Sequence, residues 1–219
     1  MKNNIYLFVG ATALLLGVFI AGTGIYKRSQ AQNYTFLAKE NSEVFVREHS
    51  PRMGSEDARV FLIEYLDPEC ESCRMFYPVV KKIMEEYSGK IQLVVRYAPF
   101  HRNSKHAIRV LEATKEQGKY WEALGFLFEN QPKWADHHNP KPEMVYELLP
   151  QIGIDIAKLK EDMKNPKIDK VIEQDYQDLK TLNVRGTPSF FVNGKKPEGF
   201  GYMPLKKLIE SEVAEAYKD

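Results

Sequence analysis

The chain has 219 residues, of which 43% are hydrophobic and 28% are charged, a composition that excludes an intrinsically disordered protein. Its 31 Lys and Arg residues nearly balance its 30 Asp and Glu residues, and the formal charge of +1 argues against a protein that binds nucleic acid. The two cysteines, Cys70 and Cys73, are too few for a disulfide-stapled miniprotein or a zinc site of four thiolates within one chain.

The first predicted element is an apolar segment at residues 5–26, which holds no charged residue and has basic residues on both sides. At ~1.5 Å per residue, a helix of this length reaches about 33 Å, enough to cross a hydrocarbon core of ~30 Å. Residues 1–26 are therefore predicted to form an N-terminal transmembrane helix that anchors the protein. A cleaved signal peptide ending near Ser29-Gln30-Ala31 is the alternative, although signal peptides usually have a shorter apolar region.

A polar stretch at residues 27–55 follows and shows no sustained helical or strand period. It is predicted to be a linker with one short strand at Val44–Val46. Residues 56–219 have a globular pattern without internal repeats or low-complexity tracts, so they are predicted to form the functional domain.

The domain opens with an apolar run, Val60–Leu66, which predicts a buried strand interrupted by a single acid, Glu64. The cysteine pair comes next and is followed by apolar residues at helical spacing, a helix that contains Pro78 and should be kinked there. Asp67 or Glu69 is expected to cap this helix. A second strand is predicted at 91–97, and a strand, a helix and a strand of these lengths imply a parallel pair.

The following ninety residues have helical periodicity, and strand character returns only near the C-terminus. Asn193-Gly194 is a strong signal for a hairpin turn. The pattern indicates an α/β fold, with helices at 107–113, 120–128, 144–149, 156–163 and 168–179, a strand at 189–192 and a last helix at 204–216.

The two cysteines lie one helical turn apart at the start of a helix, close enough to form a disulfide. The unsatisfied amides of that helix end stabilise a thiolate and lower the pKa of the first cysteine, which makes its accessible sulfur a nucleophile toward another disulfide. The second cysteine can then resolve the mixed disulfide. A purely structural disulfide here is disfavoured, because a four-residue loop removes little chain entropy.

A metal site is the competing interpretation of the cysteine pair. Together with His101 and His106 the pair has the ligand types of a zinc site, and its thiolates, helped by Met75, could capture Cu(I). The adjacent His137-His138 lies in a polar segment and is interpreted as a solvated loop. The redox interpretation requires neither a metal nor a cofactor.

Several features together resemble the DsbA-type thiol-disulfide oxidoreductases of the thioredoxin superfamily. The similarity runs from about Ser50 to the end of the chain and includes the helical stretch in mid-chain. It implies a thioredoxin fold interrupted by a helical subdomain at about residues 103–169. The motifs that carry it are Glu64-x5-Cys70-x2-Cys73, the helix with Pro78, and Thr187-Pro188 after Gly186.

The resemblance also implies roles for individual residues. Cys70 is the expected attacking thiol and Cys73 the resolving thiol, and Glu64 matches a buried acid beneath the active site. A carboxylate on a dry strand should have a raised pKa and can exchange a proton with Cys73. The bond between Thr187 and Pro188 is expected to be cis and to present backbone groups to an extended substrate.

The implied clients are cysteine-containing exported proteins, and the implied partner is a membrane redox protein that recharges the pair. The domain would then face the periplasm or another extracytoplasmic space, tethered to the cytoplasmic membrane. Glu71-Ser72 departs from the Pro and His of strong oxidants, so a less acidic Cys70 and a less oxidising pair are expected. A metal-delivery protein and a non-catalytic binding module remain alternatives.

Overall fold

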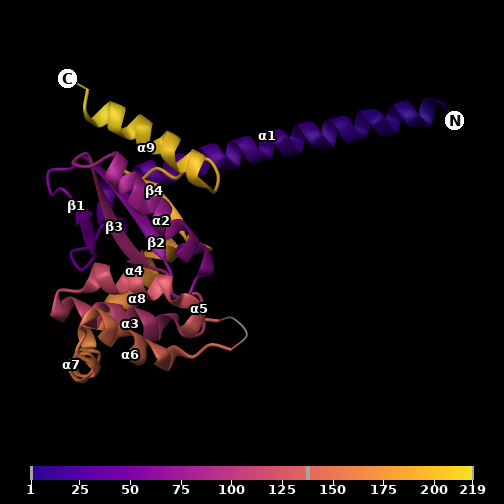
Figure 1. Cartoon of the computed structure of the whole chain (residues 1–219). Helices are drawn as coiled ribbons and strands as arrows, with labels where there is room; N and C mark the ends of the chain where they lie inside the picture. Colours follow the sequence, from indigo (N-terminus) through magenta and orange to yellow (C-terminus); the bar gives the residue numbers. More distant parts are fainter. Residues whose placement is uncertain (1, 137–138, 219) are drawn as a thin grey trace.

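The computed structural model describes residues 2–136 and 139–218, and within its first helix it describes side chains only at residues 12 and 14–34. A four-stranded sheet forms the centre of the domain, in the spatial order β1-β3-β2-β4 (Figure 1). The strands are β1 (Arg52–Gly54), β2 (Val60–Leu66), β3 (Ile91–Tyr97) and β4 (Ser189–Val192).

The strand pairing confirms the predicted parallel unit. β2 and β3 run parallel, with Val60 opposite Ile91 and Leu66 opposite Tyr97. β1 pairs antiparallel with β3, and β4 pairs antiparallel with β2. This arrangement with its helical insertion is the thioredoxin-like α/β fold that the resemblance implied.

Helices cover the sheet and extend one end of it. The helix that follows the cysteines and the C-terminal helix lie beside the sheet, whereas the mid-chain helices form a separate layer at one end of it (Figure 1). The bounds are α2 (Glu71–Glu86), α3 (Ser104–Thr114), α4 (Tyr120–Glu129), α5 (Gln131–Trp134), α6 (Val145–Leu148), α7 (Ile156–Asp162), α8 (Pro166–Thr181) and α9 (Tyr202–Ala216). Short 3₁₀ turns lie at 42–44, 115–117, 142–144 and 149–152.

Local chemistry explains several of these boundaries. Asn165 caps α8 by accepting a hydrogen bond from the amide of Lys167, and Pro166 occupies its first turn, where a missing amide hydrogen costs nothing. Asn193 and Gly194 both have positive φ, 47° and 78°, as a tight hairpin turn requires. The helix predicted at 144–149 is instead an α-helical turn between two 3₁₀ turns that contain proline.

Alternation along β2 builds a core on each face of the sheet. Leu62 and Leu66 point into the larger core with Cys73, whereas Ile63 and Tyr65 point into a smaller core on the other face. Since side chains alternate along a strand, Glu64 shares the face of the larger core with Cys73. The sheet therefore places an acid on the side of the sheet where the cysteines lie.

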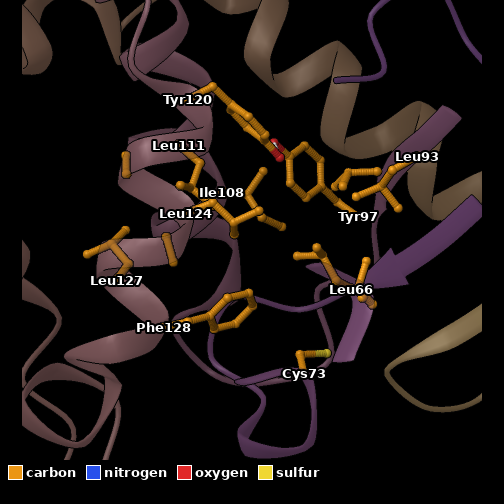
Figure 2. Close-up of a cluster of buried hydrophobic side chains, with 14 of the residues drawn as sticks. Leu66, Cys73, Leu93, Tyr97, Ile108, Leu111, Tyr120, Leu124, Leu127 and Phe128 are labelled. Carbon is orange, nitrogen blue, oxygen red and sulfur yellow. Dashed lines mark hydrogen bonds between the residues drawn. The ribbon is translucent and has the colours of Figure 1, made fainter. Parts of the chain in front are cut away.

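The larger core extends from the sheet into the helical layer. Figure 2 shows Tyr97 of β3 and Tyr120 of α4 meeting through their hydroxyl groups, which are 2.9 Å apart. The Tyr97 hydroxyl also donates to Glu112 at 2.7 Å, so both tyrosine hydroxyl groups have buried hydrogen-bond partners. Cys73 lies at the opposite end of the same cluster, near Phe128 (Figure 2).

The segment predicted as a linker differs from the expectation. Helix α1 runs without interruption from Lys2 to Glu40 and so includes the first part of the linker. The strand predicted at Val44–Val46 is absent; a 3₁₀ turn occupies 42–44, and the strand of this region is β1 at Arg52–Gly54. Val44 and Phe45 are buried in the smaller core, so the segment after α1 packs on the domain.

The expected transmembrane helix is not confirmed. Residues 5–26 lie inside α1, which projects from the domain as one long helix (Figure 1). Within the described part of the chain, however, no helix combines the length and apolar content needed to span a bilayer. Many side chains of the predicted span, those of residues 5–11 and 13, fall outside that part.

A buried charge network joins α8 to the sheet. Arg96 of β3 is fully buried and donates to Asp175 at 2.7 Å and to Asp178 at 2.6 Å. Arg47 donates to Asp178 at 2.9 Å, and the Nε2 atom of His49 lies 2.7 Å from Asp175. The network therefore fixes the segment after α1 to α8 and β3.

Candidate active site

The cysteine pair lies where β2 gives way to α2. Cys70 is the N-cap residue of α2, in place of the expected Asp67 or Glu69, and Cys73 lies one turn further along. Both are free thiols; Cys73 is fully buried, and Cys70 is 7% exposed. Cys70 is thus more enclosed than expected, and its Sγ atom lies 3.4 Å from the carbonyl oxygen of Thr187.

Hydrogen bonds make Cys70 acidic. The largest effect is a hydrogen bond from Cys73, and burial opposes it. Thr187 and the backbone amides of Ser72 and Cys73 add further hydrogen bonds to the sulfur. Together they lower the pKa of Cys70 to about 5, so the thiolate predominates at neutral pH.

Cys73 has the opposite character. Burial raises the pKa of its thiol well above the ordinary value, and the hydrogen bond to Cys70 and the charge of Glu64 raise it further. The amide of Asp67 points at its sulfur from 3.5 Å. Cys73 therefore keeps its proton while Cys70 is ionised.

Glu64 lies on β2, opposite Val95 of β3 and Phe190 of β4. It is 3% exposed, and burial raises its pKa to about 8. At neutral pH most of this carboxyl is protonated, and the charge that it carries when ionised acts on Cys73. Its proton affinity is therefore suited to exchange with a buried thiol.

The loop before β4 faces the cysteines. The Thr187-Pro188 peptide bond is cis, and it adjoins a cavity of about 370 Å³ that also involves the loop before α9. The ring of Phe200 in that loop lies 4.9 Å, centroid to centroid, from Phe76 of α2. An apolar groove thus continues away from the cis bond.

Three residues that fix the cysteine loop were not assigned this role from the sequence. Asp67 is fully buried and accepts hydrogen bonds from the amides of Glu69 at 2.9 Å and Phe100 at 2.9 Å. Glu69 in turn accepts from the amide of Asn103 at 2.6 Å. Gln131 of α5 donates to the carbonyl oxygen of Cys70 at 3.1 Å. The only sequence signal was an acid directly after a buried strand.

The structure does not assemble the alternative metal site. His101 holds its Nδ1 atom 2.8 Å from Asp67, and His106 packs against Tyr146. Across residues 2–136 and 139–218, no group of three or more His, Cys, Asp or Glu side chains could hold a metal ion. His137 and His138 lie outside the described residues.

Comparison with known proteins places these features in context. Residues 47–211 match the family model described as Thioredoxin. The probable disulfide bond formation protein D of Bacillus cereus is 26% identical over 224 residues, a match that covers 97% of this chain and 99% of that protein. The crystal structure of oxidised BdbD from Bacillus subtilis superposes with a TM-score of 0.67 at 26% identity and covers 76% of this chain and 94% of BdbD.

Part of a larger protein also matches. The Na(+)/H(+) antiporter NhaA of Herminiimonas arsenicoxydans is 29% identical over 146 residues, which is 67% of this chain. The match spans only 22% of that antiporter, so the chain corresponds to less than a quarter of the antiporter's length.

Proposed function

The chain belongs to the thioredoxin family, and we propose that it is a DsbA-like enzyme that exchanges disulfides and thiols with cysteines of exported proteins. The observation that carries the proposal is the contrast within the cysteine pair. Cys70 has its pKa lowered to about 5 at the start of α2, while the buried Cys73 has its pKa raised. The Cys70 sulfur is thus ionised and can attack a disulfide, whereas the Cys73 thiol stays protonated until it resolves the mixed disulfide.

The exchange proceeds in two balanced steps. The Cys70 thiolate attacks one sulfur of a client disulfide, a Cys70–client disulfide forms, and the other client sulfur leaves as a thiolate. Cys73 then loses its proton and attacks Cys70, which forms the intramolecular disulfide and releases the second client thiolate. The client is reduced by two electrons and the pair is oxidised; the reverse sequence oxidises the client.

Glu64 is proposed to take the proton from Cys73. An ionised Glu64 would accept the proton during the second step, and a protonated Glu64 would return it in the reverse reaction. The raised pKa, about 8, supports this role, because a carboxyl with an ordinary pKa would be a weak base for a thiol.

Glu64→Gln is therefore expected to slow release of the mixed disulfide by about tenfold to a hundredfold above the pKa of Glu64. In the unaltered chain this rate should rise as pH increases through about 8, and in the variant that rise should disappear. Stopped-flow fluorescence at several pH values measures the rate of mixed-disulfide release and its pH dependence in the two proteins.

Stability separates this role from a structural one. Because folding raises the pKa of Glu64 from 4.5 to about 8, its burial costs most above pH 8. Glu64→Gln should thus unfold at higher denaturant concentration than the unaltered chain, by a margin that grows as the pH rises from about 4.5 to about 8 and is constant above it. A variant that is less stable at every pH and keeps the rate profile would exclude the proton-transfer role.

Thr187 and Pro188 are proposed to bind the client. The Thr187 carbonyl lies 3.4 Å from the attacking sulfur, so backbone pairing there would hold an extended client segment beside Cys70.

Helix α1 is proposed to anchor the enzyme to the cytoplasmic membrane, with the domain on the extracytoplasmic side. Its described apolar side chains between residues 14 and 26 are exposed; Leu14 is 70% exposed and Phe19 is 69% exposed. A redox partner in the membrane would then reoxidise or reduce the cysteine pair after each reaction with a client. Recovery of the full chain in the soluble fraction after cell lysis would oppose anchoring.

The proposed activity is tested with the full-length chain in two assays. It should accelerate the reduction of insulin by dithiothreitol and the refolding of a protein with scrambled disulfides. Equilibration with glutathione then gives the redox potential, which separates donors from acceptors of disulfides. Failure in both assays by a folded, reduced chain contradicts the proposal.

A further inference from the structure

A cluster of polar side chains joins the cysteine loop to the loop before α3. Asp67, the first residue after β2, is fully buried, and its Oδ2 atom lies 2.8 Å from Nδ1 of His101. The same oxygen accepts hydrogen bonds from the amide of His101 at 3.1 Å and from the hydroxyl of Ser104 at 2.7 Å. Glu69 accepts from the side-chain amide of Asn103 at 2.9 Å. These five residues form the Asp67 cluster, in which two carboxylates hold the two loops together.

Asp67 connects this cluster to both cysteines. Its backbone carbonyl accepts from the amide of Cys70 at 3.0 Å, and its backbone amide points at Sγ of Cys73 from 3.5 Å. His101 is therefore separated from the reactive pair by a single hydrogen-bonded residue, although it lies 34 positions after Asp67 in the sequence. About 30% of its side chain is exposed, so its ring can exchange protons with the solvent.

His101 is the member of the Asp67 cluster that can carry a positive charge near neutral pH. The hydrogen bond to Asp67 raises its pKa, burial opposes this effect, and the nearby negative charges, that of the Cys70 thiolate among them, raise the pKa further. The pKa of Cys70 is about 5 and that of His101 lies above its ordinary 6.5. Imidazolium and thiolate therefore coexist around pH 6, where the imidazolium offsets the negative charges of Asp67 and Glu69 before the sulfur.

We propose that His101 is a positioning residue of the exchange reaction, whose positive charge, held beside the cysteine loop by Asp67, favours the reduced form of the cysteine pair. The inference rests on the proposed exchange activity and adds a residue that sets its redox potential. The reduced form carries the Cys70 thiolate, whereas the disulfide is uncharged, so a nearby cation stabilises only the reduced form. The coupling is reciprocal, because the thiolate stabilises the imidazolium by the same free energy.

The reciprocal effect is measured on the unaltered full-length chain. The imidazole signals of the ¹³C-histidine-labelled protein are followed against pH by NMR, once with the pair reduced and once with the disulfide formed. The midpoint of His101 should be higher in the reduced protein, because only that form carries the thiolate. His106 is an internal reference, since burial and the charges of Arg109 and Glu143 displace its pKa, and its midpoint should not change. Equal midpoints of His101 in the two forms would overturn the inference.

Two variants separate the charge of His101 from its hydrogen bond. His101→Asn keeps an N–H donor for Asp67 but carries no charge, and His101→Ala removes both. Equilibration of each full-length variant with glutathione at pH 6 gives the equilibrium constant for disulfide formation. His101→Asn should raise this constant about threefold to tenfold, which lowers the redox potential by ~15–30 mV, and His101→Ala should raise it at least as much. The difference from the unaltered chain should shrink at higher pH, as the imidazolium loses its proton.

Lys105→Gln is the matched control, because it removes an exposed positive charge at the start of α3. Water and salt screen this charge, so the equilibrium constant should stay within about twofold. A constant that is raised in His101→Ala but not in His101→Asn would show that His101 acts only through its hydrogen bond, and no change in either variant would show that it has no effect; both results overturn the inference and leave the exchange activity standing. If the unaltered chain does not exchange with glutathione, the proposed function fails and this inference with it.

Discussion

Replacement of Cys70 by serine should abolish thiol-disulfide exchange, whereas replacement of Cys73 by serine should stop the reaction at the mixed disulfide with the client. Cys70→Ser replaces an ionised sulfur by a neutral hydroxyl, and the rate of insulin reduction should fall on the order of a thousandfold or more. Cys73→Ser keeps the attacking thiolate but lacks the resolving thiol, so a covalent complex with the client should accumulate. Non-reducing gel electrophoresis and mass spectrometry measure that complex.

Ser211→Ala is the matched control, because Ser211 is exposed on α9 and far along the chain from the pair. It should retain full activity. If Cys70→Ser kept its activity, the chain would be a binding module rather than an enzyme. If Cys73→Ser trapped no client while Cys70→Ser did, the roles of the two thiols would be reversed.

The second prediction is a large loss of stability when the buried charge network around Arg96 loses Asp175. Asp175 is 1% exposed in its side chain and pairs with the fully buried Arg96. Burial alone would raise the pKa of Asp175, but the hydrogen bond from His49 and the charge of Arg96 bring it below the ordinary value. Asp175→Ala leaves the guanidinium without its main partner and should lower the free energy of unfolding by about 3–5 kcal/mol.

Urea denaturation of the two proteins measures this loss, with Glu161→Gln as the control because its pair with Lys164 is exposed on both sides. The lowered pKa of Asp175 sets the pH dependence. Its contribution is fully present above the ordinary carboxyl pKa and is lost as pH falls through the lower pKa of the folded state. Equal unfolding free energies for Asp175→Ala and the unaltered chain would show that the network does not stabilise the fold.

Sequence patterns predicted the elements whose periodicity reflects burial. The limits predicted for β2 and β3, at 60–66 and 91–97, match the structure, because both strands are buried on two faces and so form nearly continuous apolar runs. The cysteines at the start of a helix and the turn at Asn193-Gly194 depend on neighbouring residues and were likewise predicted.

Features that depend on distant residues could not be predicted in this way. The helix through Glu40 continues from an apolar segment into a polar one, where no amphipathic pattern marks it. The hydrogen bond to the carbonyl oxygen of Cys70 comes from Gln131, 61 residues further along the chain. The ion pair between Arg96 and Asp175 joins residues that are 79 positions apart. Nothing in local spacing indicates which distant partner satisfies a buried polar group.

The ionisation of Cys70 is the property on which the mechanism depends, and its titration tests the account most directly. The ultraviolet absorbance of the reduced full-length chain is followed against pH, with Cys70→Ser as the blank. One thiolate should appear with a midpoint near pH 5, while Cys73 stays protonated. A midpoint at the ~8.5 of an ordinary cysteine would contradict the proposed nucleophile, and a midpoint near ~3.5 would contradict the weaker oxidant expected from Glu71-Ser72.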